Sequence, residues 1–424
     1  MTRKCFIIVF VFFLFAFLPV KTVKADDLKL PVVVVIDPGH GGEPGETEAN
    51  GGANYHDVYE KDMNLETALA MKKELETYQG IEVYITRDSD VEMSLNARAA
   101  FAEQVGADML ISIHYNASAD HLFYGSEVWV SAFGEYYAKG YGIASCFMEK
   151  FREEGLVDRG IKTRIGESGE DYYGIIRHCR MAGLPAVIVE HCYLDDDAEF
   201  ERADTPDEQK MFGIRDAQAV AQYYGLSKEA IPEKPAVTVE VPVPENPVLP
   251  DDTEPQNVVC RVEAFHQETG CADVLVTAEE KESRILYYAY SVDGGRNFSR
   301  LFLWEGGESM KISLPLGKSA VGTLQVRLYN NYNVKGDSDL QVYDYRPEEE
   351  KNKVYDLEDA YEIKIFPDAE NGAEESPAEE QNLTKTVDVA IVLFGFVFFV
   401  LAGVLISLMI AMRIQRKREE DIYD

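Results

Sequence analysis

The chain has 424 residues, room for two or three domains of ordinary size, and hydrophobic residues make up 46% of it. Its formal net charge of -34 argues against a nucleic-acid partner, because binding to phosphates requires an excess of Lys and Arg. The six cysteines show no CxxC spacing, which argues against a zinc ribbon or a thioredoxin-type motif. Cys260 and Cys271 are close enough in sequence to be either a disulfide or two buried thiols, and both interpretations stay open.

The first 25 residues are typical of a secretory signal. A basic start to Lys4 is followed by an unbroken apolar run from Cys5 to Leu18. The segment Val23-Lys24-Ala25 then offers small residues at the positions that a signal peptidase reads, just before two aspartates. An uncleaved anchor helix is the alternative, but the apolar run is short for a bilayer. The sequence therefore predicts export, with cleavage after Ala25.

Residues 30–226 read as one α/β domain. Apolar, strand-like runs are expected at residues 32–36, 81–86, 109–113, 127–130 and 186–189, and most are apolar throughout, which suits a sheet covered on both faces. Amphipathic helices are expected between them, at residues 61–78, 94–105 and 209–224. This alternation predicts an α/β fold.

The next two segments differ in composition from this domain. Residues 228–256 hold seven prolines with acidic residues between them, which predicts an extended, semi-rigid linker that lets its neighbours move independently. Residues 257–346 contain short β-rich runs separated by turn signals, which predicts a small all-β, sandwich-like domain.

The C-terminal part predicts membrane attachment. Residues 347–386 are acidic and typical of a disordered stalk, and residues 389–412 form an uncharged apolar run long enough to span a bilayer as a transmembrane helix. A basic tail, residues 413–424, follows at once. Since positive charge stays in the cytoplasm, we expect a single-pass protein of the cell membrane with its body extracellular.

Four polar residues follow buried segments of the α/β domain. His40 and His114 come near the ends of two apolar strands, Glu190 ends a third, and Glu60 opens a predicted helix, where a carboxylate is favoured. In open α/β sheets, ligands bind beyond the carboxyl ends of the strands, so these groups are candidates for one site.

His40, Glu60 and His114 would supply two imidazoles and one carboxylate, a known ligand set for catalytic zinc, with Glu190 left as the general base. Each residue also has an ordinary structural explanation: a histidine bonded to backbone, a helix-start carboxylate or an ion-pair partner. The spacing does not resemble His-Glu-x-x-His. The residues alone therefore suggest a metal hydrolase and leave the structural explanation open.

Several longer motifs add to this pattern and occur in one order along residues 32–225. They are IDPGHGG at 36–42, EKDMNL at 60–65, TRDSD at 86–90, SLNARAAFA at 94–102, ADMLISIHYNAS at 107–118, RGIK at 159–162 and PAVIVEHCYL at 185–194. This stretch resembles the type 3 family of zinc-dependent N-acetylmuramoyl-L-alanine amidases. The resemblance implies a mixed sheet between helices, similar to that of zinc carboxypeptidases.

The resemblance also implies roles for individual residues. His40, Glu60 and His114 match the zinc ligands of the family, and Glu190 matches its catalytic glutamate. Asp37 falls where a carboxylate would buttress His40. After Glu190 the family has Thr or Ser and then Gly-Phe, whereas this chain has His191-Cys192-Tyr193. We expect His191 to pack on the opposite face of the strand and Cys192 to share the face of Glu190, where it would be an alternative ligand.

The activity implied is hydrolysis of the amide between the lactyl group of N-acetylmuramic acid and L-alanine in peptidoglycan. The predicted export agrees with that substrate, because peptidoglycan lies outside the membrane. Two alternatives remain: a zinc peptidase that cuts within the stem peptide, and a catalytically silent wall-binding module. The presence of all four key residues argues against silence. The β-rich domain has no catalytic pattern, and a glycan or protein partner for it stays open.

Overall fold

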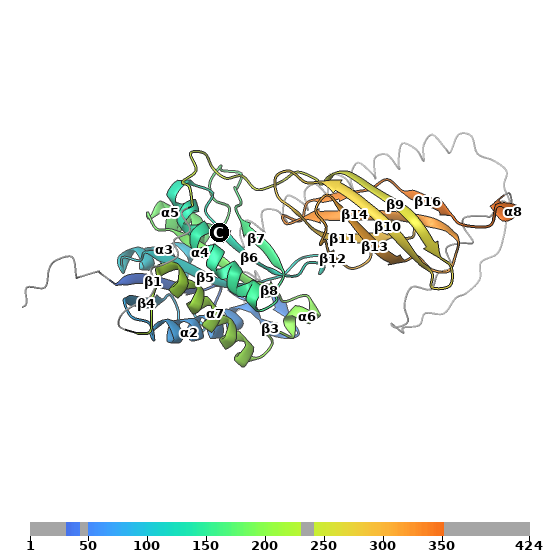
Figure 1. Ribbon diagram of the computed structural model, residues 1–424. Helices are drawn as coiled ribbons and strands as arrows, with labels where there is room; N and C mark the ends of the chain where they lie inside the picture. The colour runs from blue at the N-terminus through green and yellow to red at the C-terminus, as the bar shows by residue number, and fades with distance from the viewer. Residues whose placement is uncertain (1–30, 43–49, 230–240, 352–424) are drawn as a thin grey trace, which may run out of the picture.

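The computed structural model describes residues 31–42, 50–229 and 241–351, which form an α/β domain followed by a β-rich domain beside it (Figure 1). The predicted signal peptide, most of the acidic stalk, the predicted transmembrane helix and the basic tail lie outside these residues. Within the described ranges no helix combines the length and apolar character needed to cross a bilayer.

The α/β domain alternates strands and helices along the chain. Its strands are β1 (Val32–Pro38), β2 (Asn54–Tyr55), β3 (Val58–Tyr59), β4 (Ile81–Ile85), β5 (Met109–Asn116), β6 (Ser126–Val130), β7 (Asp158–Lys162) and β8 (Ala186–Tyr193). Its helices are α2 (Glu60–Leu75), α3 (Leu95–Gln104), α4 (Gly134–Glu153), α5 (Gly174–Met181), α6 (Asp197–Phe200) and α7 (Pro206–Tyr224). The five predicted strands and three predicted helices are all present, whereas β7, α4 and α5 were not predicted.

A six-stranded sheet in the order β4-β1-β5-β8-β6-β7 forms the centre of this domain. The first four strands run parallel, and β6 runs antiparallel to β8. The prediction of a mixed sheet between helices is therefore confirmed. Parallel β1, β5 and β8 bring their carboxyl ends to one edge, which is where ligands bind in such sheets.

Helices cover both faces of the sheet. One apolar cluster joins α2, α4 and α7 to side chains such as Ile36, Ile113 and Val189. A second cluster joins α3 and α5 to the opposite face, through side chains such as Leu110 and Ile188. Burial on both faces explains why these strands read as continuous apolar runs.

Local sequence signals fix the ends of two helices. The Ser94 side chain accepts a hydrogen bond from the backbone of Ala97 at the start of α3. Thr205 and Glu208 form a capping box at the start of α7, Pro206 occupies the first turn, and Gly225 ends the helix in the left-handed conformation. The α3 cap matters for the site, because this end of α3 lies beside the pocket described below.

The β-rich domain consists of antiparallel strands in two sheets. Its strands are β9 (Gln256–His266), β10 (Cys271–Glu279), β11 (Ile285–Ser291), β12 (Phe302–Leu303), β13 (Ser309–Pro315), β14 (Val321–Asn330), β15 (Lys335–Asp337) and β16 (Gln341–Asp344), and a short helix, α8 (Glu348–Lys351), follows. One sheet has the order β13-β10-β9 and the other β12-β11-β14-β15, with β16 also paired to β14. An apolar cluster that includes Val276, Trp304 and Val326 lies between them. Cys260 and Cys271 are free thiols.

The two domains share an interface, which differs from the expected independent movement. Phe123 and Tyr193 of the α/β domain pack in one apolar cluster with Leu286, Tyr287 and Tyr329 of the β-rich domain. The proline-rich segment also contacts both sides. The Val248 backbone exchanges hydrogen bonds with Ala132 and Thr163, and the buried Asp251 accepts one from Asn330. Proline content indicated an extended chain but carried no information about what that chain packs against.

Candidate active site

His40 is held in an unusual backbone conformation just after β1. Its φ is 57°, in the left-handed region that residues other than glycine rarely adopt. The Arg98 guanidinium donates a hydrogen bond to the His40 carbonyl at 2.6 Å, and Gly39 N–H donates to the Ile113 carbonyl at 3.0 Å. Strained residues that their surroundings hold in place cluster at functional sites.

Glu60 is the first residue of α2, and only 4% of its surface is exposed. Its carboxylate accepts hydrogen bonds from the backbone N–H of Ala53 at 2.9 Å and of Tyr115 at 3.3 Å. The N-cap residue, Tyr59, makes no side-chain cap, and Glu60 in the first turn places a carboxylate at the positive end of the helix dipole. These contacts fix the carboxylate at the edge of the sheet.

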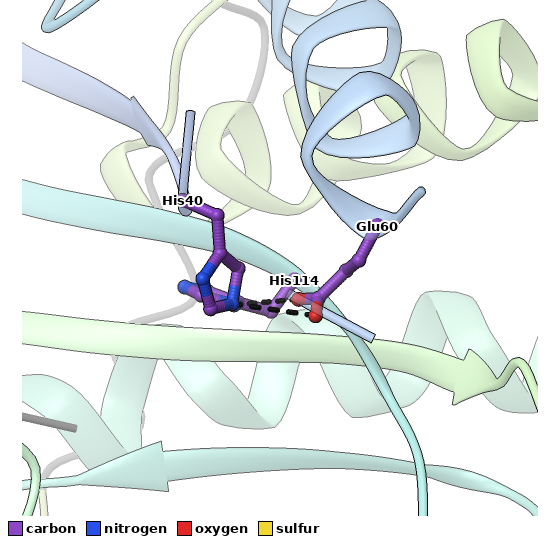
Figure 2. Close-up of side chains that lie close together, drawn as sticks. All are labelled: His40, Glu60 and His114. Atoms are coloured by element: carbon purple, nitrogen blue, oxygen red, sulfur yellow. Dashed lines mark hydrogen bonds and ion pairs between the residues drawn. The ribbon is translucent and has the colours of Figure 1, made fainter. Parts of the chain in front are cut away.

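His40, Glu60 and His114 converge (Figure 2). His114 Nδ1 lies 2.8 Å from Glu60 Oε1, and His40 Nε2 lies 3.3 Å from Glu60 Oε2. One ligand atom from each side chain lies within 4.8 Å of the other two. Two imidazoles and one carboxylate in this arrangement fit the donor set of a catalytic zinc site.

Two glycines make this convergence possible. A Cβ added to Gly39 would lie 2.1 Å from the His114 ring, and one added to Gly52 would lie 2.4 Å from Glu60 Oε2. Gly52 also has a positive φ of 67°. Any side chain at either position would displace a proposed ligand, so both backbones must approach closely.

The ionisation of these groups is coupled. Burial opposes the charged form of Glu60, but the adjacent His40 and His114 rings outweigh it and hold the pKa of the carboxyl well below its usual range. Burial lowers the pKa of His114, although the Glu60 carboxylate opposes that shift. An ionised carboxylate beside neutral imidazole is the protonation state in which these residues bind a metal.

Glu190 lies in β8, directly between two polar neighbours on adjacent strands. It pairs in register with His114 of β5 and with Glu127 of β6. Its side chain is buried, and Oε2 has no hydrogen-bond partner among the described residues. Burial raises the pKa of Glu190 well above its usual range, and the negative charges of Glu60 and Glu127 add to the shift. A carboxyl whose pKa is raised holds a proton more readily than an ordinary glutamate, which suits a group that takes up and releases a proton.

A cavity of about 260 Å³ lies at this edge of the sheet. His40, His114 and Glu190 line it, together with Ser94 at the start of α3 and Tyr173 beside the start of α5. Three of the four predicted site residues therefore line one pocket at the carboxyl edge of the sheet, and the fourth, Glu60, contacts both histidines.

Asp37 is linked to His40 through Arg98. It accepts hydrogen bonds from Arg98 and Thr86 at 2.6 Å and from Ser112 at 2.8 Å, and Arg98 in turn holds the His40 carbonyl. Burial opposes ionisation of Asp37, but Arg98 and these hydrogen bonds lower its pKa. The support that the resemblance implied therefore reaches the backbone of His40 through Arg98.

The residues after Glu190 depart from simple strand alternation. His191 packs against the rings of Tyr115 and Phe212, as expected, and its Nε2 lies 2.8 Å from the buried Asp216 carboxylate. The expectation that Cys192 shares the face of Glu190 is wrong. A register shift between β5 and β8 follows the His114–Glu190 pair, and Cys192 lies in the core cluster with its thiol toward the Glu199 carbonyl.

One buried network beside the pocket was not predicted. Glu127 of β6 and Arg159 and Lys162 of β7 are each at most 2% exposed, and Glu127 pairs with both cations. A lone glutamate among apolar strand residues and the RGIK motif were the available signals. Neither indicates on its own that the three side chains meet.

Known proteins resemble the α/β domain in sequence. Residues 34–222 match the family profile of N-acetylmuramoyl-L-alanine amidase. The chain is 29% identical over 206 residues to the N-acetylmuramoyl-L-alanine amidase CwlM of Bacillus licheniformis, covering 47% of this chain and 71% of that protein. It is 28% identical over 205 residues to the sporulation-specific N-acetylmuramoyl-L-alanine amidase of Bacillus subtilis, covering 46% and 70%.

Among solved structures, the catalytic domain of CwlV, an N-acetylmuramoyl-L-alanine amidase from Bacillus (Paenibacillus) polymyxa var. colistinus, is 30% identical. The match covers 46% of this chain and 99% of that one, with a TM-score of 0.39. All of these matches concern just under half of the chain.

Proposed function

Because this chain belongs to the N-acetylmuramoyl-L-alanine amidases, we propose that its pocket is a zinc site for hydrolysis of the amide between the lactyl group of N-acetylmuramic acid and L-alanine. The observation that carries the proposal is the meeting of His40, Glu60 and His114 within 4.8 Å, beside the buried Glu190.

His40, Glu60 and His114 would hold the metal, and Glu190 would stay outside its ligand set. The donor set fits, because the pKa of Glu60 is held well below its usual range, burial lowers the pKa of His114, and backbone contacts hold Glu60 and His40 in place. A zinc ion bound there would polarise the scissile carbonyl and make water a better nucleophile.

Glu190 carries the proton in this proposal. Its Oε2 has no hydrogen-bond partner among the described residues, and its pKa is raised. Both features suit it to take a proton from the attacking water and to give it to the departing amine nitrogen. The amide bond between the lactyl carbonyl carbon and the nitrogen of L-alanine breaks, and water supplies the new carboxylate oxygen. The products are a free lactyl carboxyl group and a free N-terminus on the stem peptide.

The proposal extends to location. Peptidoglycan lies outside the cytoplasmic membrane, and a secretory signal at residues 1–25 with an apolar, uncharged run at residues 389–412 would place an anchored body beside it. External protease added to intact protoplasts should then remove the body from the cell. Protection of the body would contradict this orientation.

The direct test of the activity is digestion of purified peptidoglycan with the zinc-loaded protein, followed by mass spectrometry of the new ends. Free lactyl groups together with stem peptides that begin with L-alanine are expected. New ends within the stem peptide would instead show a zinc peptidase. Binding without any new ends would show a silent wall-binding module.

A further inference from the structure

Glu127 ties together β5, β6 and β7 of the central sheet. Its carboxylate accepts hydrogen bonds from Asn116 of β5 at 2.9 Å, from Trp129 of its own strand at 3.1 Å, from Arg159 at 2.7 Å and from Lys162 at 2.6 Å. Glu127 is also the in-register neighbour of Glu190 on β8. The position of this carboxylate therefore helps to define the position of the strand end that carries Glu190.

Arg159 depends on the β-rich domain for its hydrogen bonds. Its side chain is fully buried and donates to Glu127, to the Tyr124 carbonyl at 3.3 Å, to the Tyr287 hydroxyl at 3.0 Å and to Asn333 Oδ1 at 2.7 Å. Two of these four acceptors, Tyr287 and Asn333, belong to the β-rich domain. A buried guanidinium that loses its acceptors is strongly destabilised, so Arg159 cannot keep this position without them.

The β-rich domain also contacts the backbone of β7 and the residue that follows this strand. Asn331 donates to the Arg159 carbonyl at 3.3 Å, and the backbone of Thr163 donates to the Tyr332 hydroxyl at 3.1 Å. The Lys162 ammonium lies 5.4 Å from the centre of the Tyr332 ring. Asn331, Tyr332 and Asn333 form the turn between β14 and β15. Since β7 is the last strand of the sheet, this turn contacts the strand that has no further partner in the sheet.

We propose that the β-rich domain is part of the catalytic unit, because its Tyr287 and Asn333 hold Arg159 against Glu127 and thereby position Glu190. Tyr287 and Asn333 are positioning residues and do not touch the substrate. The chain of contacts runs from the β11 strand and the β14–β15 turn through β7 and β6 to β8. The inference rests on the proposed role of Glu190, and it assigns the β-rich domain a function apart from binding glycan or a partner.

A merely structural interface makes a different prediction. It would lower the melting temperature when broken but leave turnover per folded molecule unchanged. Positioning requires that turnover itself falls, because misplacing a catalytic group by about 1 Å costs up to about 10²-fold in rate. The two cases therefore separate on kcat measured for zinc-loaded, folded protein.

The test uses the full chain with Tyr287→Phe and Asn333→Gly combined. Phenylalanine removes only the hydroxyl, and glycine tolerates the positive φ of 67° at position 333. Tyr288→Phe is the matched control, because Tyr288 is the next residue of β11 and packs in the core of the β-rich domain. Asn333→Asp is the conservative variant, because it keeps an acceptor for Arg159.

On soluble muropeptides we expect the double variant to lose about 10-fold or more in kcat, with KM and zinc content near those of the wild type. Tyr288→Phe and Asn333→Asp should keep kcat within about twofold. Hydrogen–deuterium exchange in the peptide spanning residues 186–193 should speed up only in the double variant.

Unchanged kcat and unchanged exchange at residues 186–193, with or without a lower melting temperature, would overturn the inference. An equal fall of kcat in Tyr288→Phe would do so as well. Wild-type protein that cleaves no muropeptide would contradict the proposed function instead, and the exchange comparison would still decide whether the two domains are coupled.

Discussion

Two buried polar clusters lie side by side on the central sheet and differ in how their charges are balanced. In one, Glu127 accepts four hydrogen bonds and pairs with Arg159 and Lys162. In the other, Glu60 contacts two histidines, and Glu190 has an oxygen without a partner among the described residues. Buried carboxylates are normally satisfied. The cluster with the unsatisfied carboxylate oxygen is the one that we propose as the zinc site, and the balanced cluster lies beside it.

Adjacent glutamates show the same contrast in their ionisation. Burial would raise the pKa of Glu127, but Lys162 and Arg159 outweigh it and lower the pKa to about 2. Burial raises the pKa of Glu190, its in-register neighbour, well above the usual range, and the negative charges of Glu60 and Glu127 add to the shift. The same residue type on neighbouring strands is thus fixed as an anion in one place and left able to exchange a proton in the other.

The largest effect is expected from removing a proposed metal ligand. His114→Ala should lose zinc and should lower amidase activity to background, since two ligand side chains cannot hold the ion as three do. Metal content by mass spectrometry and turnover on muropeptides measure both. His266→Ala is the control, because His266 lies half-exposed on β9. Full zinc occupancy in His114→Ala would remove this residue from the site.

Breaking the ion pairs of Glu127 should lower the free energy of unfolding. Glu127→Ala leaves Arg159 and Lys162 buried without their anion, which typically costs about 3–5 kcal/mol in the free energy of unfolding. Glu263→Ala, which breaks the exposed contacts to Lys311 and Arg261, should cost much less, because solvent screens exposed ion pairs. Denaturant unfolding of both variants provides the comparison. Similar costs for the two would show that the buried network has no special role.

The pH dependence of that stability follows from the pKa of Glu127. Because about 2 in the folded protein lies below the ordinary value of 4.5, the ionised carboxylate stabilises the fold above about pH 4.5, and this contribution disappears as the pH falls toward 2. The stability gap between wild type and Glu127→Gln should therefore be full at pH 6 and shrink below pH 4.5. Melting curves from pH 3 to 7 measure the gap, and a constant gap would contradict the proposed ion pairing.

The smallest effect on stability is expected from a variant that removes only one of several hydrogen-bond donors to a buried carboxylate. Thr86→Val removes one hydrogen bond to Asp37, but Arg98 and Ser112 still satisfy that carboxylate. We expect a loss of about 1 kcal/mol in unfolding free energy, with zinc content and turnover unchanged. A large loss of zinc in this variant would mean that Asp37 controls His40 more directly than its contacts indicate.

Much of the site could be predicted because three of its residues lie at the ends of apolar runs that are recognisable as strands. Apolar runs identify β1, β5 and β8, and parallel strands bring their carboxyl ends together, so His40, His114 and Glu190 converge once the topology is known. Glu60 is a candidate from its place at a predicted helix start, and the family resemblance matches it to a zinc ligand. The mixed sheet between helices followed from the same resemblance.

The rest depended on contacts that no local pattern encodes. Strand β7 carries Arg159 and Lys162 and lacks an apolar run, so its place in the sheet is set by pairing with β6 and by the β-rich domain. The register shift after Glu190 turned Cys192 into the core, where simple alternation placed it on the pocket face. The proline-rich segment indicated a linker, but the interface beside it is formed by residues distant in sequence.

The most direct test of the account is Glu190→Gln, with zinc content, melting temperature and turnover measured on one sample. The amide keeps the shape of the side chain but cannot accept a proton from water. We predict full zinc occupancy, an unchanged or higher melting temperature and a loss of about 10²–10⁴ in turnover. Near-normal turnover would contradict the role of Glu190 as the proton carrier, and loss of zinc would show that it is a ligand.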